Sequence, residues 1–423
     1  MTSQKLNTQD IKTLGLSALG GALEFYDFVI FVFFAKTLGA LFFPPDMPAW
    51  MSQLQVYGIF ASGYIARPIG GIVLAHFGDL LGRKKMFTLS VFMMAVPTLA
   101  IGLLPNYSQL GIIAPILLLF LRVVQGIAIG GEVPAAWVFV AEHVPKGRVG
   151  FACASLTSGL TLGILMGSLM ASSIYSRLPS EEVLTYGWRI PFIVGGLFGF
   201  MAVYLRGWLK ETPVFLAMKE RKEINKDIPL KTVLKNHRPG VILSMLITWM
   251  LTAAIMVIIL MTPTLIQTQF QITAARAFLG NNWAAFSLVI GCLVAGVIAD
   301  KIGHAKALLI GSIILIIANY TLYWDLMNGA ANFIPLYALT GFTVGVVGIV
   351  PSMMIAAFPP AVRFSGLSFS YNLSYAIFGA ITPPFISYLS SHLGGLAPAH
   401  YVGLAAGVTI LITLKAVRTT KSI

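Results

Sequence analysis

The chain has 423 residues, of which 57% are hydrophobic and only 10% are charged, and its formal net charge is +13. A soluble domain carries about 25% charged residues, so this composition excludes an ordinary soluble protein. The basic residues are scattered over short loops and form no stripe or tail, so the positive charge indicates a cytoplasmic membrane surface and not a nucleic acid partner.

Apolar stretches of about 20 residues recur along the whole chain, and this is the length that crosses a bilayer core. The polar start, residues 1–12, has no signal-peptide cleavage pattern, so we predict that the first stretch is a retained span. The fold class is therefore an all-α membrane protein with twelve transmembrane helices. The predicted spans are residues 14–36, 53–77, 86–104, 111–141, 149–174, 188–209, 240–262, 278–299, 306–325, 332–357, 364–389 and 400–417.

Five ionisable residues lie well inside the first, second and fourth spans: Glu24, Asp27, Arg67, Arg122 and Glu132. Each charge at this depth costs at least ~2.5–3.5 kcal/mol, so these side chains should face one another or a water-filled cavity. Glu24 and Asp27 are three residues apart and share a helix face.

The spacing within span one suggests a proton carrier. Two carboxyl groups this close titrate as a coupled pair, and one of them can hold a proton near neutral pH. We favour Asp27 as the carrier and Glu24 as its partner, with the reverse assignment open. Glu132 is either a second proton site or a structural partner of Arg122. A fixed salt-bridge network of all five residues is the structural alternative.

A polar segment, residues 210–239, separates two halves of six spans each. We predict an N-terminal bundle over residues 1–209, a cytoplasmic central loop over 210–239, and a C-terminal bundle over 240–423. Lys and Arg are concentrated in alternate short loops, so both termini should be cytoplasmic. The central loop is either a solvated linker or an amphipathic helix on anionic headgroups.

The two halves also repeat a loop motif. The segment from Ala75 to Lys85 follows span two, and the segment from Gly296 to Lys306 follows span eight. Both read small residue, three residues, Asp, two residues and Gly, followed by a basic residue. Duplicated six-span halves indicate a transporter that binds its substrate between them and opens alternately to each side.

With these motifs the chain resembles the major facilitator superfamily, and within it the metabolite:proton symporter family of proline/betaine, dicarboxylate/citrate and shikimate carriers. The first loop matches the superfamily signature around Asp79 and Arg83, although Ala75 and Leu80 depart from it; the second has His304 where Arg is usual. Further matches are Glu24-Phe25-Tyr26-Asp27-Phe28, Arg67-Pro68, Arg122-Val123-Val124-Gln125-Gly126, Gly130-Gly131-Glu132, Trp188-Arg189-Ile190-Pro191-Phe192, Glu211-Thr212-Pro213 and Arg363 with Ser365-Gly366.

The resemblance implies two pseudo-symmetric six-helix bundles around a central cavity lined by spans one and four. It also implies that Asp27 pairs with Arg122, as in proton-linked sugar carriers, and that protonation of Asp27 releases the Arg.

A cytoplasmic gate is expected at the repeated loops. An acidic side chain is stabilised at a helix N-terminus, so Asp79 should lie against the start of span eleven, near Arg363. Arg83 and Glu142 would extend this gate as an ion pair, and Asp300 is the gating residue of the second loop. The alternative is that the loop residues only anchor the loops and set topology.

Cationic and aromatic side chains are the candidates for substrate binding. Arg122 is the expected carboxylate ligand; Arg67 either assists it or pairs with Glu24 or Asp27. A tryptophan can hold a quaternary ammonium by cation–π attraction. The remaining candidates are Gln125, Trp249, Tyr371, Asn372 and Tyr375, for each of which simple packing is the alternative.

Several classes are excluded. No catalytic nucleophile, nucleotide-binding motif or metal-ligand spacing occurs, so we predict no enzyme activity, no cofactor and no metal.

The predicted function is proton-coupled symport, with uptake of a small organic acid or zwitterion by a monomer in a bacterial inner membrane. Its partners are the substrate, protons and the lipid bilayer, and no nucleic acid. The alternative is a proton-coupled antiporter that exports a metabolite or drug; antiporters of this superfamily usually carry a Gly-Pro step in span five, which Gly159-Leu160 and Gly163-Ile164 lack.

Overall fold

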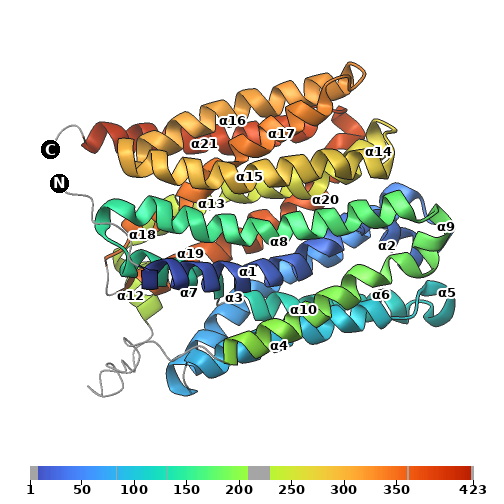
Figure 1. The fold of residues 1–423 in the computed structure, drawn as a ribbon, viewed down its shortest axis with the longest axis horizontal. Coiled ribbons are helices and arrows are strands. Elements are labelled where there is room, and N and C mark those ends of the chain that lie inside the picture. Colours follow the sequence, from blue (N-terminus) through green and yellow to red (C-terminus); the bar gives the residue numbers. More distant parts are fainter. Residues whose placement is uncertain (1–7, 82, 131, 208–228, 360–361, 421–423) are drawn as a thin grey trace.

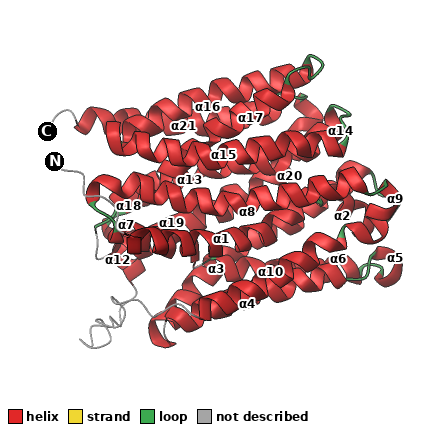
Figure 2. Ribbon diagram, in the orientation of Figure 1, coloured by secondary structure: helices red, strands yellow, loops and turns green. Residues whose placement is uncertain are grey.

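The computed structural model describes residues 8–81, 83–130, 132–207, 229–359 and 362–420, and all regular elements in these residues are helices (Figure 2). Eight of the described helices are long and apolar enough to cross a bilayer by themselves, and α1 with α2, bent by 59°, forms a ninth span. The three others are span three, span four and the more polar span eleven. The predicted fold class of twelve spans is confirmed for the part of the chain that the structure describes.

The N-terminal half contains the first six spans, joined by the short α5 (Tyr107–Leu110), α9 (Ser180–Glu182) and two single-turn helices. Its spans are α1 (Thr8–Phe33) with α2 (Ala35–Phe42), α3 (Ala49–Leu81), α4 (Arg83–Leu103), α6 (Ile113–Ile129) with α7 (Glu132–His143), α8 (Val149–Arg177) and α10 (Arg189–Gly207).

In the C-terminal half three spans are interrupted by other helix types, and the short α12 (Pro229–Asn236) precedes them. The π-helix η3 (Ala254–Met261) divides span seven, a 3₁₀ turn η4 (Gly345–Ile349) divides span ten, and the π-helix η6 (Tyr375–Gly379) divides span eleven. The α-helical parts are α13 (Arg238–Ala253), α14 (Thr262–Gln269), α15 (Ala274–Ile302), α16 (His304–Met327), α17 (Phe333–Val344), α18 (Val350–Ala356), α19 (Arg363–Ser374), α20 (Ala380–Leu393) and α21 (Ala397–Thr420).

The two halves use the same packing scheme (Figure 1). In the first half α1 packs against α8, α4 against α10 and α3 against α6; in the second α13 packs against α19, α16 against α21 and α15 against α17. Adding six to each span number converts the first set into the second. The halves are therefore two pseudo-symmetric six-helix bundles.

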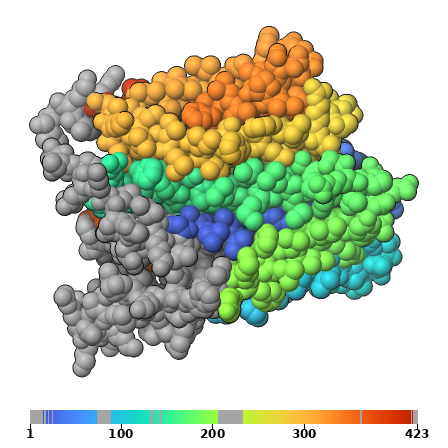
Figure 3. Space-filling model, in the orientation of Figure 1, coloured from blue at the N-terminus to red at the C-terminus, as the bar shows by residue number. Residues whose placement is uncertain are grey.

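Two symmetry-related seams join the bundles. Along one, α8 packs against α15; along the other, α3 packs against α19, η6 and α20. On the face shown in Figure 3 the green α8 and the yellow-to-orange α15 meet without an opening between them. The bundles are thus closed on each other along these helices.

Glycine allows two helices of the first bundle to touch at the depth of the buried arginines. A Cβ atom on Gly126 would lie 2.0 Å from the carbonyl oxygen of Gly63, so the backbones of α6 and α3 are in direct contact. Small residues permit this approach in membrane helices, as the sequence predicts. The close contact brings Arg122 on α6 and Arg67 on α3 into one region.

Candidate functional site

A small cavity lies between the two bundles. Only about 20 Å³ of it is open to a water-sized molecule, which suffices for a water but not for a metabolite. Among the described residues, this cavity is therefore too small to hold a metabolite. The lining side chains come from α1, α3, the end of α6 and α8 on one side and from η3 and η6 on the other: Phe25, Phe28, Val29, Tyr64, Arg67, Ile129, Ile164, Ile255, Met256, Leu260 and Tyr375.

Arg67 is the charged side chain of this lining. It is only 2% exposed, and its guanidinium carbon lies 4.5 Å from the ring centre of Tyr375, 5.3 Å from that of Tyr64 and 5.6 Å from that of Tyr371. The rings of Tyr64 and Tyr375 stack on each other across the seam. No carboxylate among the described side chains pairs with Arg67, and its Nε has no hydrogen-bond partner there.

Arg122 is fully buried and is already held by protein groups. One terminal nitrogen donates to Gln125 Oε1 at 2.8 Å, and the other donates to the Phe28 carbonyl at 3.2 Å. Three rings enclose the guanidinium at 4.0 to 4.7 Å, those of Phe28, Phe31 and Phe60. In this conformation Arg122 is not open to a substrate, which differs from the expectation that it is the main carboxylate ligand.

Asp27 does not pair with Arg122, although both side chains are described. Its carboxylate, 1% exposed, faces Gly195 and Gly199 of α10, and its Oδ1 has no hydrogen-bond partner in the described structure. The side chain that reaches it is Thr98 of α4. The expected direct ion pair is therefore wrong for this conformation, because α1 turns Asp27 into the interior of its own bundle.

A chain of polar side chains replaces the direct pair. Gln125 Nε2 donates to Thr98 Oγ1 at 2.7 Å, while Gln125 Oε1 accepts from Arg122. Both ends of the Gln125 amide are thus used, which differs from its predicted role in substrate binding. The sequence analysis missed Thr98. The available signal was a polar residue directly after Pro97 in the stretch 91–104, which is otherwise apolar.

Two candidates from the C-terminal half lie away from the cavity. Trp249 stacks on Phe378 at 4.7 Å and donates to the Tyr401 hydroxyl at 3.0 Å, so it belongs to the interior of that bundle. Asn372 donates to the Gly130 carbonyl of the other bundle, which makes it a contact across the seam. Of the predicted set, Tyr371 and Tyr375 do reach Arg67.

Five predicted residues have side chains outside the described part of the structure. They are Glu24, Glu132, Asp79, Arg83 and Glu142. Arg363 is the first residue of α19, is partly buried and has interaction partners.

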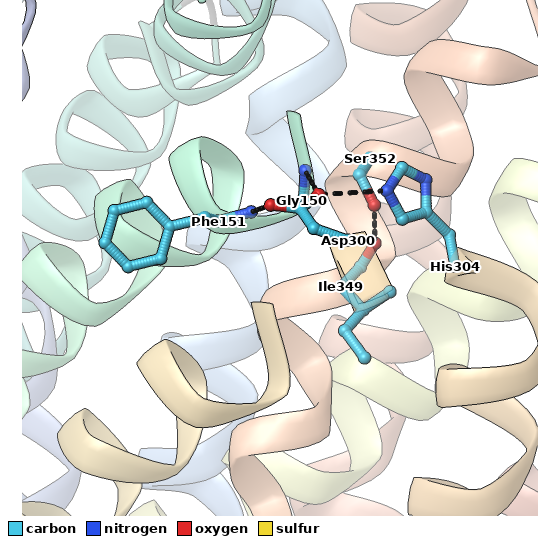
Figure 4. A network of polar contacts seen from close by, with 6 residues as sticks. All are labelled: Gly150, Phe151, Asp300, His304, Ile349 and Ser352. Carbon is cyan, nitrogen blue, oxygen red and sulfur yellow. Dashed lines mark hydrogen bonds and ion pairs between the residues drawn. The ribbon is translucent and has the colours of Figure 1, made fainter. Parts of the chain in front are cut away.

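One end of the first seam is closed by Asp300 (Figure 4). Its Oδ1 accepts the backbone N–H of Gly150 at 2.8 Å, and its Oδ2 accepts that of Phe151 at 3.0 Å. These N–H groups belong to the first turn of α8, where no backbone carbonyl is available to them. The last turns of span eight thus cap the start of span five, and His304 Nε2 lies 3.5 Å from the same carboxylate.

The opposite end of this seam is closed by amide and aromatic contacts. Asn281 of α15 donates to Ser168 of α8 at 2.9 Å, and its Oδ1 accepts from the Tyr337 hydroxyl at 2.6 Å. Beyond it, the ring of Phe278 stacks on that of Tyr175. The cavity is therefore separated from both sides of the membrane along this seam.

Comparison with known proteins gives one family. The model of the Major Facilitator Superfamily matches residues 18–383. The chain is 32% identical to the inner membrane metabolite transport protein YhjE of Escherichia coli (strain K12), over 95% of this chain and 93% of that protein. It is 30% identical to the glycine betaine/proline/ectoine/pipecolic acid transporter OusA of Dickeya dadantii (strain 3937), over 95% of this chain and 82% of that protein.

The fold has a close counterpart among solved structures. The partially occluded, inward-open xylose transporter XylE from E. coli superposes with a TM-score of 0.76 over 97% of this chain and 98% of that chain, at 16% sequence identity. At this identity the likeness establishes the fold alone.

The capping contact of Asp300 leads to a prediction for the variant Asp300→Ala. Loss of a helix cap costs about 1–2 kcal/mol, so this end of the seam should open roughly 5 to 30 times more often. Cys153 and Cys292, both buried on the seam helices α8 and α15, report this opening through their rate of reaction with a small maleimide.

Asp325→Ala is the matched control, because the Asp325 carboxylate also accepts a backbone N–H, that of Asn332, but within one bundle. We expect no change of cysteine reactivity in this control. Equal labelling rates in the parent and in Asp300→Ala would show that the cap does not hold the seam closed.

Proposed function

The chain belongs to the Major Facilitator Superfamily, and from this membership and the geometry of its cavity we infer that it is a secondary active transporter that takes up a small organic acid or zwitterion together with protons. Its relatives are named as transporters, and it is a transporter and not an enzyme. The observation that carries the proposal is the position of Arg67, a buried guanidinium on the central cavity without a described carboxylate partner.

Charge compensation supports an anionic group on the substrate. A buried cation is costly unless it is paired, and the aromatic rings around Arg67 supply only about 0.5–2 kcal/mol each. Asp27 does not pair with Arg67, because its carboxylate faces Gly195 and Gly199 of α10. A substrate carboxylate would meet a guanidinium that can bind it through two parallel hydrogen bonds. Glu24 and Glu132 are the competing partners for Arg67.

The rest of the lining supports a zwitterion whose cationic end is shielded from water. Phe25, Phe28, Tyr64 and Tyr375 are aromatic, and ring faces attract quaternary ammonium groups. The OusA relative is named for glycine betaine, proline, ectoine and pipecolic acid, which all combine a carboxylate with a positively charged nitrogen group. Tyr375 and Tyr64 replace Trp249 in the proposed role of ammonium ligand.

Asp27 is the proposed proton carrier. Its burial, together with an oxygen that has no hydrogen-bond partner among the described residues, supports a carboxyl group that is stable when protonated. Thr98 and Gln125 link it to Arg122, which packs on Phe28 of the cavity. Glu24 and Glu132 stay candidate proton sites under this proposal.

Alternating access would proceed by rocking of the bundles about the cavity. Asp300 caps span five from span eight; the pseudo-symmetry supports the same role for Asp79 from span two toward span eleven, near Arg363, with Arg83 and Glu142 beside it. We place the protein in the inner membrane with residues 210–239 as the cytoplasmic connection between bundles 1–209 and 240–423.

The first prediction concerns transport by purified protein in liposomes, with glycine betaine, proline and citrate as probes. An acidic outside medium should drive uphill accumulation of at least one probe, and a protonophore should abolish it. Asp27→Asn should keep exchange of that probe across the membrane but lose accumulation, because an amide cannot carry the proton. Accumulation driven by the opposite pH gradient would instead identify an antiporter.

The second prediction concerns Arg67. Hydrogen bonds to charged groups contribute about 1.5–3 kcal/mol, so Arg67→Ala should weaken binding of the transported probe by about 10- to 100-fold in a thermal-shift titration. Arg67→Lys keeps the charge but loses the planar fork and should restore only part of the affinity. Arg276→Lys, at the exposed outer end of α15, is the control. Unchanged affinity in Arg67→Ala would show that Arg67 pairs with a carboxylate of the protein instead.

The third prediction concerns orientation. In a variant without Cys153 and Cys292, a cysteine at Lys306 should react with a membrane-impermeant maleimide only from the cytoplasmic side, and one at Glu181 only from outside, because the basic loops stay inside. Labelling of position 306 from outside would reverse the topology and the assignment of Asp300 to the cytoplasmic gate.

A further inference from the structure

Four side chains form a continuous polar chain through the first bundle. Asp27 on α1 and Thr98 on α4 meet beside Gly195 of α10. Thr98 accepts from Gln125 on α6 at 2.7 Å, and Gln125 accepts from Arg122 at 2.8 Å. Asp27, Gln125 and Thr98 are all buried. The chain connects the proposed proton carrier to the guanidinium that packs on Phe28, a residue of the cavity wall.

Thr98 is the link whose hydrogen bonds must depend on the state of Asp27. A hydroxyl has one proton to donate and two lone pairs to accept with. The Thr98 hydroxyl donates to the Met94 carbonyl at 2.9 Å and receives the Gln125 N–H, so one lone pair is left. Asp27 can use this lone pair only when it carries a proton of its own.

The two protonation states therefore act differently on Gln125. An ionised Asp27 only accepts, so the Thr98 proton turns toward it; the polarised hydroxyl then becomes a stronger acceptor for Gln125. A protonated Asp27 donates to the remaining lone pair of Thr98 Oγ1, and this second donor makes the oxygen a weaker acceptor for Gln125. The first state holds Gln125 and Arg122 in place, and the second loosens them.

We propose that Thr98 is a positioning residue that transmits the protonation state of Asp27 to Arg122 through Gln125, and so couples proton binding to the cavity. This inference rests on the proposed proton-coupled transport.

Few other titratable groups face Asp27. Tyr26, its neighbour on α1, donates to the Pro191 carbonyl at 3.1 Å, and α10 presents Gly195 and Gly199. Glu24 lies one turn earlier on α1, with its side chain outside the described structure. Thr98 is therefore the described side chain that joins Asp27 to another helix by a polar contact.

The test compares Thr98→Val, which removes the hydroxyl at nearly constant shape, with Thr98→Ser, which retains it. Thr409→Val is the matched control, because Thr409 is also fully buried in a helix but bonds only within α21. In liposomes, Thr98→Val should exchange glycine betaine at a rate within about threefold of the parent's. Its gradient-driven accumulation should be at least about tenfold lower than the parent's. Thr98→Ser and Thr409→Val should resemble the parent in both.

An infrared measurement makes the test independent of the substrate. The carbonyl stretch of protonated Asp27, assigned by its loss in Asp27→Asn, should shift in Thr98→Val because the hydrogen-bond partner is gone. It should stay in place in Thr409→Val. A role of Thr98 in packing alone would leave the position of this band unchanged.

The outcomes separate this inference from the proposed function. A parent protein that accumulates no probe overturns both. A parent that accumulates glycine betaine, beside a Thr98→Val variant with equal accumulation or an unshifted band, overturns only the role of Thr98. If Thr98→Val does not fold, Gln125→Met breaks the same chain one bond further on and must show the same loss of accumulation with exchange retained; equal accumulation there overturns the proposal.

Discussion

The structure depends on keeping two guanidinium groups, those of Arg67 and Arg122, inside a membrane protein. A cation at this depth is stable only if other groups replace its water. The terminal nitrogens of Arg122 donate to Gln125 and to a backbone carbonyl, and three phenylalanine rings enclose its guanidinium, whereas Arg67 contacts three tyrosine rings. The Nε of each arginine has no hydrogen-bond partner among the described residues. Arg122 is thus held by side-chain and backbone acceptors of the first bundle, whereas Arg67 lines the cavity among tyrosine rings, and our proposal assigns substrate binding to Arg67 on this difference.

The same constraint shapes the helices around these arginines. Glycine contacts between α3 and α6 bring the two cations into one region, and the π-helices η3 and η6 place Met256 and Tyr375 on the cavity from the other bundle. π-helical turns are frequent at functional sites because they shift side chains out of the regular helical register. Both π-helices occur in the bundle without described intramembrane charges on its cavity wall, so that bundle contributes ring faces and apolar surface while the first contributes the charge.

Capping of a helix end and a side-chain amide contact close the cavity along the seam between α8 and α15. Asp300 supplies the acceptors that the first turn of α8 lacks, and Asn281 joins α15 to α8 near the other end of the same seam. Such contacts each contribute about 1–2 kcal/mol, which is enough to favour a closed state and small enough to be exchanged for others when the bundles rock. A gate built from a few weak contacts is consistent with a protein that must open to both sides.

The sequence by itself determined the number of spans, the two-bundle architecture and the burial of Asp27, Arg67 and Arg122, because the lengths of apolar runs and the cost of intramembrane charge are local properties. It could also place Tyr64 beside Arg67, three residues away on one helix face. It could not decide which helix each charge faces. Asp27 was expected against Arg122 and instead lies against Thr98 and two glycines of α10, and Trp249 was expected at the cavity and instead stacks on Phe378. The alternatives differ in the rotation of a helix about its own axis, and that rotation is set by its packing against several neighbouring helices. Only the tertiary structure decided it.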